Sequence, residues 1–307
     1  MITATLFSDP GCPWAYSENP ALRVLEWRYG DQLDWTLVLI GLTDSAEQYA
    51  RRGYTPLRGV LGALTFRRYG MPFMLAPKSQ LSATARACRA VIAARHQSPG
   101  SEWRVFRAIQ LANFNTGLIL EDDAGLRDVI ATVDGVDADA VIAALDSDEV
   151  TAAYEADKAR SRTAAGSPTE LQGKAGNTDG TVRYTAPSII FRNGDRRLEA
   201  GGFQPVEAYD VIIANLDPTL DRQAPPETPE PLLERFAGGL TTQEVAACMT
   251  HGNDPVDRTA AEAALIELVG EGRAVRTPLG DDALWAAARV TAPAARTNGR
   301  SHNLTLT

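Results

Sequence analysis

The chain has 307 residues, of which 44% are hydrophobic and 22% are charged. This length predicts two domains, and this composition is typical of a folded globular protein and excludes a disordered or fibrous chain. The formal charge of −9 argues against nucleic acid and anionic membranes as partners, because both are bound by cation-rich surfaces.

The cysteines and histidines are few and scattered: Cys12, Cys88, Cys248, His96, His251 and His302. Their spacing fits no metal site, so we expect no metal. An odd and low cysteine count argues against a disulfide framework and for a reducing compartment. The first residues lack the basic and apolar segments of a signal peptide, and no run of 18 apolar residues is present. We therefore expect a cytoplasmic protein that does not cross a membrane.

The first 42 residues predict a strand, a helix and a second strand. The apolar run Ile2–Ser8 ends at Asp9-Pro10-Gly11, which is typical of a buried strand that leads into a turn. Pro13 suits the first position of a helix, and Trp14–Arg28 has helical spacing. The nearly continuous apolar run Trp35–Leu42 is typical of a central parallel strand. Together they indicate a βαβ unit.

Helical periodicity follows, and it indicates a helical insertion at about residues 43–165. The expected helices are Ser82–His96, Glu102–Asn115, Asp123–Val133, Ala138–Leu145 and Asp148–Arg162. After the Gly- and Ser-rich stretch 167–180, Asn193-Gly194 between the apolar runs Ala186–Phe191 and Arg197–Ala200 predicts a hairpin, and Val206–Leu216 a last helix. This order of elements is that of an α/β, thioredoxin-like domain over residues 1–216.

Residues 217–230 contain four prolines and no apolar periodicity, which indicates an extended linker. Residues 231–290 then predict a small winged-helix-like domain with three helices (Pro231–Ala237, Thr241–Met249 and Asp257–Gly270) and two strands (Ala274–Thr277 and Ala283–Ala287). Thr241 and Glu244 have the spacing of a capping box. Residues 291–307 are polar and aperiodic, so we expect a flexible tail.

A winged helix raises the possibility of DNA binding, which the charges argue against. The third helix of this domain has four acidic residues around it (Asp257, Glu262, Glu267 and Glu271) against Arg258, and it would repel phosphates. Only Arg273 and Arg276 in the predicted hairpin argue for nucleic acid. We therefore prefer a structural or protein-contact role.

Cys12 stands at the junction of the first strand and helix. Free N–H groups and the positive end of the dipole at a helix N-terminus stabilise an anion, so a cysteine there favours the reactive thiolate. The turn before Cys12 and Pro13 after it indicate an exposed position. The competing interpretation is a small buried apolar residue, which is the more common role of a free cysteine.

Three short motifs resemble one known family. The segment from Asp9 to Tyr16 (DPGCPWAY) is similar to the active-site segment of the DsbA family of thioredoxin-fold oxidoreductases, particularly its cytoplasmic branch, in which Cys-Pro-Trp-Cys follows Asp-Pro. Thr185–Ser188 (TAPS) resembles the cis-proline loop of that family, and Gly201–Pro205 (GGFQP) its turn into the last helix. The resemblance covers about residues 1–216 and implies a thiol–disulfide oxidoreductase.

The resemblance also implies roles for individual residues. Pro187 would be cis and would face Cys12, which would be the catalytic nucleophile. The backbone of Ala186 would pair with the substrate, and Pro13 and Trp14 would flank it. A tryptophan in a first helical turn is as often simply packed, so both interpretations of Trp14 stay open.

One departure from the family decides the expected chemistry: Ala15 occupies the position of the second cysteine, so no internal disulfide can form. We expect a monothiol mechanism, in which Cys12 attacks a disulfide and an external thiol resolves the product. A small thiol (mycothiol, bacillithiol or glutathione) would be a co-substrate rather than a tightly bound cofactor. Small disulfides, and protein mixed disulfides, would be the partners, and Cys88 and Cys248 core residues.

Two alternatives stay open. Kappa-class glutathione transferases and hydroxychromene-carboxylate isomerases also lack the Cys-x-x-Cys pair and usually carry Ser where Cys12 stands; in them a bound thiol cofactor does the chemistry. The loss of the second cysteine also fits a catalytically inactive binding or regulatory module.

Three polar residues near Cys12 have simple structural interpretations. We expect Asp9 to be a turn residue, with tuning of the Cys12 pKa as the alternative. We expect Tyr16 and Ser17 to be packed rather than to act as proton donors.

Overall fold

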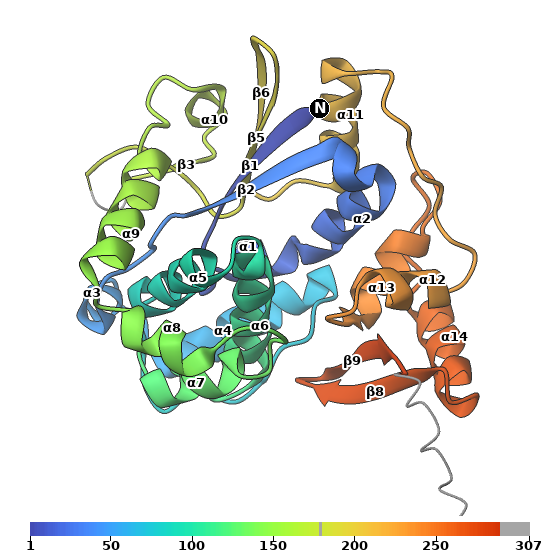
Figure 1. The fold of residues 1–307 in the computed structure, drawn as a ribbon, viewed down its shortest axis with the longest axis horizontal. Coiled ribbons are helices and arrows are strands. Elements are labelled where there is room, and N and C mark those ends of the chain that lie inside the picture. The colour runs from blue at the N-terminus through green and yellow to red at the C-terminus, as the bar shows by residue number, and fades with distance from the viewer. Residues whose placement is uncertain (178–179, 289–307) are drawn as a thin grey trace, which may run out of the picture.

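A four-stranded mixed sheet forms the centre of the chain in the computed structural model, which describes residues 1–177 and 180–288 (Figure 1). The strands are β1 (Ile2–Ser8), β2 (Leu33–Leu39), β5 (Ser188–Asn193) and β6 (Arg196–Gly201), in the order β2-β1-β5-β6. β1 runs parallel to β2 and antiparallel to β5. The thioredoxin-like α/β fold is therefore confirmed, with the predicted hairpin as β5 and β6.

The two faces of the sheet build two different cores. Leu6 of β1 and Leu37 of β2 belong to the larger core, which α2 (Asn19–Tyr29), α5 (Ala85–Gln97), α6 (Ser101–Asn115) and α11 (Val206–Leu216) cover. Phe7 and Val38, one position along each strand, face a smaller core that contains Cys12. Successive side chains of a strand point to opposite faces, so both faces of β1 and β2 are apolar.

The helix that follows Cys12 is broken. The sequence predicts one helix over Trp14–Arg28, whereas the structure has α1 (Pro13–Ser17) and α2, and the short helix η1 (Gly30–Gln32) follows α2. The prediction was wrong because Pro20 has no N–H to donate to the carbonyl of Tyr16. The side-chain amide of Asn19 donates to that carbonyl instead, at 3.0 Å.

The helical insertion is confirmed and contains more helices than the sequence predicts. Besides α5 and α6, it has α7 (Asp123–Ile130), α8 (Ala138–Ala144) and α9 (Asp148–Ser161), all at predicted positions. Before them come α3 (Ala46–Arg51), α4 (Pro56–Phe66) and the short helix η2 (Arg67–Tyr69), which were not predicted. Gly59 and Gly62 weaken the helical signal of α4, and no residue of α3 or α4 is fully buried.

Three short elements lie between the insertion and β5, two of them within the predicted break 167–180 and the third just after it. They are α10 (Pro168–Leu171), β3 (Ala175–Gly176) and β4 (Arg183–Tyr184), and the two strands form a ribbon. Strands of two residues are too short to show a periodic pattern. Tyr184 of β4 stacks on Phe7, with ring centroids 4.6 Å apart, and so closes the smaller core that contains Cys12.

The C-terminal unit (residues 230–288) has the predicted three helices and hairpin, and one further strand. Its elements are α12 (Glu230–Arg235), β7 (Leu240–Thr241), α13 (Thr242–Met249), α14 (Arg258–Gly270), β8 (Ala274–Leu279) and β9 (Asp282–Ala287). The sheet order is β7-β9-β8, and the capping box of Thr241 and Glu244 is confirmed. The name winged helix and the domain boundaries stay predictions, and residues 289–290 and the predicted tail lie outside the described residues.

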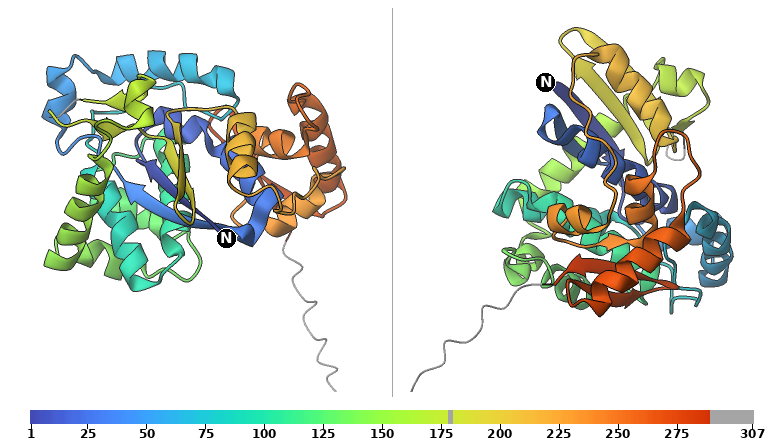
Figure 2. Two further views of the ribbon diagram at one scale, coloured as in Figure 1. Left: turned by 90° about the horizontal axis from the view of Figure 1, so that it is seen from above. Right: turned by 90° about the vertical axis from the view of Figure 1, so that its right-hand side faces the viewer.

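The C-terminal unit shares its core with α2. Val24 and Trp27 of α2 are buried together with Leu265 and Trp285, and the views in Figure 2 show the C-terminal elements beside α2. The predicted linker has neither helix nor strand up to residue 229, and α12 begins at its last residue, Glu230. The linker is held against α2, because the indole N–H of Trp27 donates to the carbonyl of Ala224 at 2.8 Å. The two predicted domains are therefore packed together through a common helix.

The turn of the β8–β9 hairpin is docked on the insertion. Asp281 accepts a hydrogen bond from the backbone of Phe73 at 2.9 Å and pairs with Arg67 at 2.6 Å. Gly280 has a φ of +55°, and a Cβ there would lie 2.9 Å from the carbonyl carbon of Phe73, so the close approach requires glycine. The tip that would enter a groove in a DNA-binding winged helix is thus engaged within the chain.

A buried ion pair joins α6 to α13. Arg107 donates to both carboxylate oxygens of Glu244, at 2.6 and 2.8 Å, and to the carbonyl of Gly239 at 2.8 Å. Glu244 is fully buried and also accepts from the backbone of Thr241. Burial raises the pKa of Glu244, but the charge and hydrogen bonds of Arg107 outweigh burial, and the pKa is below its usual value.

Replacing Arg107 with Leu leaves the Glu244 carboxylate buried without its counter-ion. We expect the free energy of unfolding at pH 7, measured by urea denaturation, to fall by about 3–5 kcal/mol. A carboxyl with a lowered pKa in the folded state stabilises above the ordinary Glu value of ~4.3 and loses that effect as the pH falls. The difference between the variant and the parent protein should therefore shrink below that pH.

The matched control is Arg104→Leu on the same helix, because Arg104 is exposed. Its effect should stay within about 0.5 kcal/mol. Equal losses for the two variants would show that the ion pair does not hold the C-terminal unit in place.

Candidate functional site

Cys12 lies where the sequence predicts, directly before the first helical residue. β1 ends at Ser8, the backbone of Cys12 donates to the carbonyl of Asp9 at 3.1 Å, and Cys12 is the N-cap of α1 with Pro13 in the first turn. Proline is favoured there because the first N–H groups of a helix have no partner within it. The Cys12 Sγ donates a hydrogen bond to the carbonyl of Ala186 at 3.1 Å.

Cys12 is buried, with only 5% of its surface exposed. It packs with Phe7, Val38 and Tyr184 in the smaller core. Burial raises the pKa of the thiol to about 12; hydrogen bonds from the Ala15 and Trp14 amides lower it only in part. The expectation of an exposed cysteine with a lowered pKa was therefore wrong: loss of solvent outweighs the helix N-terminus, and the resting thiol is protonated.

The proline predicted to be cis is cis: the peptide bond between Ala186 and Pro187 has that conformation. Both residues are buried, and the loop that they form joins β4 to β5. The structure thus brings Cys12, Ala186 and Pro187 together, although 174 positions separate Cys12 from Ala186. The roles of Pro13, Ala186 and Pro187 in binding a substrate stay predictions.

Trp14 is partly packed and partly exposed, so the structure leaves open both interpretations given for it, a packed side chain and one that flanks a substrate. Its side chain is 40% exposed, and it contacts the rings of Phe66, Tyr69 and Phe203, with centroids 4.8, 5.7 and 5.6 Å away. We call these four residues the Trp14 cluster. Phe66 is the last residue of α4 and Tyr69 the last residue of η2, and neither helix was predicted from the sequence. Phe203 belongs to the GGFQP turn, and an aromatic residue in that motif was the one sequence signal for the Trp14 cluster besides Trp14 itself.

Ala15 packs beside Cys12 and is 3% exposed, so the position of the missing second cysteine is filled by the small core. All three cysteines are free. Cys88 and Cys248 are buried in the other cores, as predicted. An intramolecular disulfide at the Cys12 motif is therefore excluded, because residue 15 carries no sulfur.

Asp9 braces the turn in front of Cys12. Its fully buried carboxyl accepts hydrogen bonds from the backbone of Gly11 at 2.8 Å, the backbone of Leu42 at 2.9 Å and the hydroxyl of Thr84 at 2.9 Å. The expectation of a turn residue is confirmed by the bond to Gly11. Burial raises the pKa of Asp9, and its charge in turn contributes to the raised pKa of Cys12.

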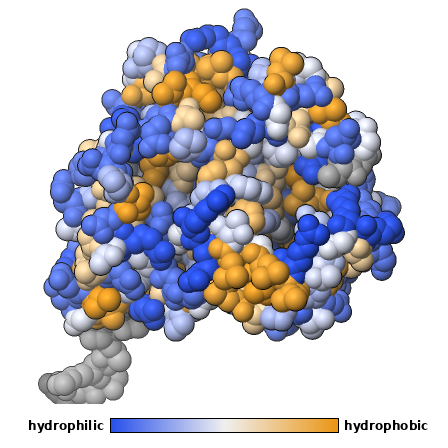
Figure 3. Space-filling view, turned by 180° about the vertical axis from the view of Figure 1, so that it is seen from behind, coloured by the Kyte–Doolittle hydropathy of each residue, from blue (hydrophilic) through white to orange (hydrophobic). Residues whose placement is uncertain are grey.

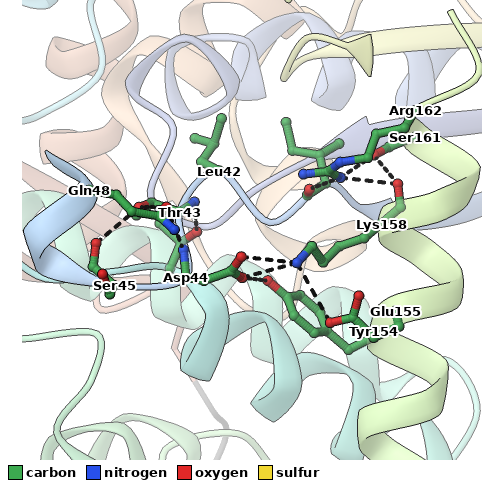
Figure 4. Close-up of polar contacts among 12 residues, drawn as sticks. Leu42, Thr43, Asp44, Ser45, Gln48, Tyr154, Glu155, Lys158, Ser161 and Arg162 are labelled. Atoms are coloured by element: carbon green, nitrogen blue, oxygen red, sulfur yellow. Dashed lines mark hydrogen bonds and ion pairs between the residues drawn. The ribbon is translucent and has the colours of Figure 1, made fainter. Parts of the chain in front are cut away.

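The segment after β2 is held against α9 next to this brace. Figure 4 shows Asp44 directed towards Tyr154 and Lys158, with contacts of 3.1 Å to each. Arg162 donates to the carbonyl of Ile40 at 2.9 Å. These contacts hold the segment that leads into α3. Burial is the main cause that raises the pKa of Tyr49 on α3, and the charges of Asp9 and Cys12 add to the rise.

Tyr16 and Ser17, which directly follow Ala15, are buried. The Tyr16 hydroxyl donates to the carbonyl of Pro72 at 3.0 Å and accepts from the side-chain amide of Asn115 at 2.8 Å. Tyr16 is therefore a packed residue, as expected. Ser17 is 3% exposed, and its hydroxyl has no hydrogen-bond partner among the described residues.

An apolar surface adjoins the Trp14 cluster. Leu57, Leu61 and Leu64 of α4 are 61%, 55% and 49% exposed. The face on which α4 lies shows a hydrophobic patch in Figure 3. α4 contacts α1 and ends at Phe66 of the Trp14 cluster. The three exposed leucines and the Trp14 cluster therefore lie next to each other on the surface.

Residues 1–177 and 180–288 contain neither a candidate metal site nor a candidate membrane-spanning helix. In these ranges, no three side chains of His, Cys, Asp or Glu are grouped so that they could hold a metal ion. The helices in the same ranges include none that is both long and apolar enough to cross a membrane.

Two solved structures illustrate the similarity of the fold. A probable DsbA oxidoreductase from Streptomyces coelicolor superposes with a TM-score of 0.54 at 18% identity, over 71% of this chain and 91% of its own. The cytosolic disulfide reductase DsbM from Pseudomonas aeruginosa superposes with a TM-score of 0.50 at 20% identity, over 70% of this chain and 98% of its own. No curated protein matches the sequence.

The family is shown by the sequence itself. The sequence model of the DSBA-like thioredoxin domain matches residues 3–185, which is more than half of the chain. The matched region holds Cys12, its turn and the helical insertion. The chain therefore belongs to the DSBA-like thioredoxin domain family, a family of the thiol–disulfide oxidoreductase type.

Proposed function

We propose that this protein catalyses thiol–disulfide exchange through the single thiol of Cys12, with a small thiol as the second reactant. One observation carries the proposal: the Cys12 Sγ lies 3.1 Å from the carbonyl of Ala186, directly before cis Pro187. An extended disulfide substrate that pairs with the Ala186 backbone would bring its sulfur to Cys12. A cytoplasmic location, where small thiols are reduced, fits this chemistry.

The reaction has two balanced steps. The Cys12 thiolate attacks one sulfur of a disulfide, the S–S bond breaks, and the other sulfur leaves as a thiolate. A second thiolate from solution then attacks the mixed disulfide, releases Cys12 and forms a new disulfide. Because Ala15 cannot resolve the mixed disulfide, the external thiol is required in every turnover.

The raised pKa of Cys12 sets a condition on the first step. In the resting protein the thiol is neutral and bonded to Ala186, so the substrate has to displace that bond and expose the sulfur. α3 and α4, which follow the segment next to Cys12, contain no fully buried residue. We infer that the thiolate forms when the substrate enters.

The pH dependence of alkylation tests this condition. In a Cys88→Ser/Cys248→Ser background, we expect iodoacetamide to modify Cys12 at a rate that rises about tenfold per pH unit up to pH 10, because the pKa is about 12. A free thiol levels off above ~8.5. Mass spectrometry of the peptide that contains Cys12 gives the rates, and a plateau below pH 9 would contradict a buried neutral thiol.

A second candidate function is favoured by the same neutral thiol. A protonated Cys12 can donate a hydrogen bond to the sulfur of a bound thiol cofactor, as the corresponding Ser would in the kappa-class type of mechanism. In this case the cofactor thiolate attacks the substrate and Cys12 forms no covalent bond. Cys12 would then be needed for its S–H donor only.

Two substitutions at Cys12 separate the candidates. Exchange through Cys12 predicts that Cys12→Ser and Cys12→Ala both lose activity towards small mixed disulfides, whereas the donor role predicts that Cys12→Ser keeps it and Cys12→Ala loses it. Incubation with the oxidised forms of glutathione, mycothiol and bacillithiol should give a mass adduct on Cys12 only for exchange. Cys88→Ser is the matched control and should behave as the parent protein in both cases.

The apolar surface of α4 supports protein mixed disulfides as substrates. Changing Leu57, Leu61 and Leu64 together to Ser should leave the fold intact, because all three are about half exposed. We expect KM for a glutathionylated protein to rise several-fold, and KM for oxidised glutathione to stay unchanged. Equal changes for both substrates would show that α4 acts on the Cys12 site itself and not on docking.

A further inference from the structure

The exposed leucines of α4 form one stripe along the helix. Leu57, Leu61 and Leu64 are spaced by four and then three residues, so their side chains lie on one face. Ala63 and Phe66 lie on the other side of the helix and pack against a buried apolar cluster of the insertion. α4 is therefore attached to the protein by one side, and its leucine face points outward.

A helix of this composition normally buries its apolar face. Most of the stability of a helix in a protein comes from packing that face against another element. α4 has 11 residues with no fully buried one, and its single charged residue is Arg58. The face on which α4 lies shows a continuous hydrophobic patch with hydrophilic side chains on both sides (Figure 3). The leucine face is the part of α4 that a partner would cover.

The charge around α4 is opposite to the charge of the whole chain. Residues 46–69, from the start of α3 to the end of η2, have a net charge of +4, whereas the chain has −9. The segment contains one acidic residue, Glu47, and five arginines: Arg51, Arg52, Arg58, Arg67 and Arg68. Arg67 pairs with Asp281 of the C-terminal unit. A local positive surplus of this kind attracts a negatively charged partner.

Two of these arginines have no acidic partner within residues 1–177 and 180–288. Arg58 lies over the ring of Tyr54 at 5.2 Å and donates to the carbonyl of Gly53 at 3.1 Å. Arg68 lies over the ring of Tyr69 at 4.8 Å and donates to its hydroxyl at 2.8 Å. A ring, a carbonyl or a hydroxyl orients a guanidinium but carries no net charge to cancel it. Both arginines therefore keep a full positive charge beside the leucines.

The leucine face ends beside the Cys12 motif. Phe66, the last residue of α4, contacts the ring of Trp14 with centroids 4.8 Å apart. Tyr69, which Arg68 covers, contacts the same ring at 5.7 Å. Trp14 is two residues from Cys12. A protein that covers the leucine face would therefore have part of its surface next to the proposed reaction site.

Three occupants compete for this face. A second copy that paired through α4 would bring two segments of charge +4 together, and like charges across an interface oppose binding. An anionic membrane would attract the segment but repel the rest of a chain whose net charge is −9. A protein segment with apolar and acidic side chains matches both the leucines and the arginines.

We propose that α4 docks protein substrates through an acidic segment. Apolar side chains of that segment cover Leu57, Leu61 and Leu64, and its carboxylates meet Arg58 and Arg68. This role rests on the proposed function, in which Cys12 exchanges thiols with a mixed disulfide, and it adds the chemistry of the substrate surface. The docking is non-covalent and adds no step to the exchange.

Two peptides without cysteine test the docking independently of Cys12. They share the same leucines and differ in carrying Glu or Lys at the positions between them. Fluorescence anisotropy with the full chain at low salt should give a Kd at least about tenfold lower for the Glu peptide. Because salt screens exposed charges, this advantage should shrink as the ionic strength rises.

The same peptides with one cysteine, joined to glutathione, test docking during exchange. We expect kcat/KM to be at least about tenfold higher for the Glu peptide than for the Lys peptide. Neutral 2-hydroxyethyl disulfide is the reference for the chemistry alone. If Cys12 does not exchange thiols, none of the three is turned over, yet the cysteine-free Glu peptide still binds. If α4 does not select acidic segments, both peptides are turned over with equal kcat/KM.

Charge variants identify the arginines. Arg58→Gln with Arg68→Gln should reduce the preference for the Glu peptide to less than about threefold. Arg58→Lys with Arg68→Lys keeps both charges and should keep the preference. Arg104→Gln with Arg276→Gln is the matched control, because it removes the same charge from exposed positions on α6 and β8. Circular dichroism and the melting temperature check that each variant is folded.

Four results would each overturn the proposal. Two are an equal Kd for the Glu and Lys peptides, and a preference that Arg58→Gln with Arg68→Gln leaves unchanged. The third is a dimer in analytical ultracentrifugation that becomes a monomer when the three leucines are changed to Ser, because a second copy would then cover α4. The fourth is binding to phosphatidylserine vesicles that the same leucine variant loses, because a membrane would then be the occupant.

Discussion

The buried carboxyl of Asp9 joins the three segments that meet at Cys12. It accepts from the turn at Gly11, from Leu42 after β2 and from Thr84 before α5, so one side chain fixes the loop that carries the thiol relative to the sheet and to the insertion. Removing its carboxyl would leave backbone N–H groups of two loops without an acceptor. The position of the Cys12 Sγ under the Ala186 carbonyl depends on this brace.

Burial of Cys12, together with the nearby Asp9 carboxyl, explains why the helix N-terminus does not lower the pKa of the thiol. A helix dipole acts on a charge that already exists, whereas burial opposes the formation of that charge. At Cys12, burial is nearly complete, the Asp9 charge adds repulsion, and α1 is only five residues long. The result is a neutral thiol bonded to a carbonyl. Its reactivity is set by whatever displaces that hydrogen bond, which makes access to Cys12 part of the chemistry.

The fold was largely predictable from the sequence because its central strands and long helices carry strong apolar patterns. Cys12 and the cis bond before Pro187 were found by resemblance, which pattern alone does not supply for residues 174 positions apart. Burial of Cys12 was not predictable, since the residues that cover it, such as Tyr184 in a strand of two residues, have no periodic signal. The break between α1 and α2 at Glu18 was not predicted, although Pro20 marks it, because the helical spacing of apolar residues continues across the break.

The Trp14 cluster lies between Cys12 and a cavity that is lined by Glu18, Gln204 and Ala247. Tyr69 and Phe203 contact Trp14 through their rings and also line the cavity. The break between α1 and α2 places Glu18 at this cavity, and Gln243 and Ala247 of α13 line it as well. Burial raises the pKa of the Glu18 carboxyl to about 8, and the groups that hydrogen-bond to it, Tyr209 and Gln204, come from α11 and from the turn before α11. Two buried groups with raised pKa values, the Glu18 carboxyl and the Cys12 thiol, therefore lie near the Trp14 cluster. A displacement of either ring would change the packing of Trp14, which is two residues from Cys12.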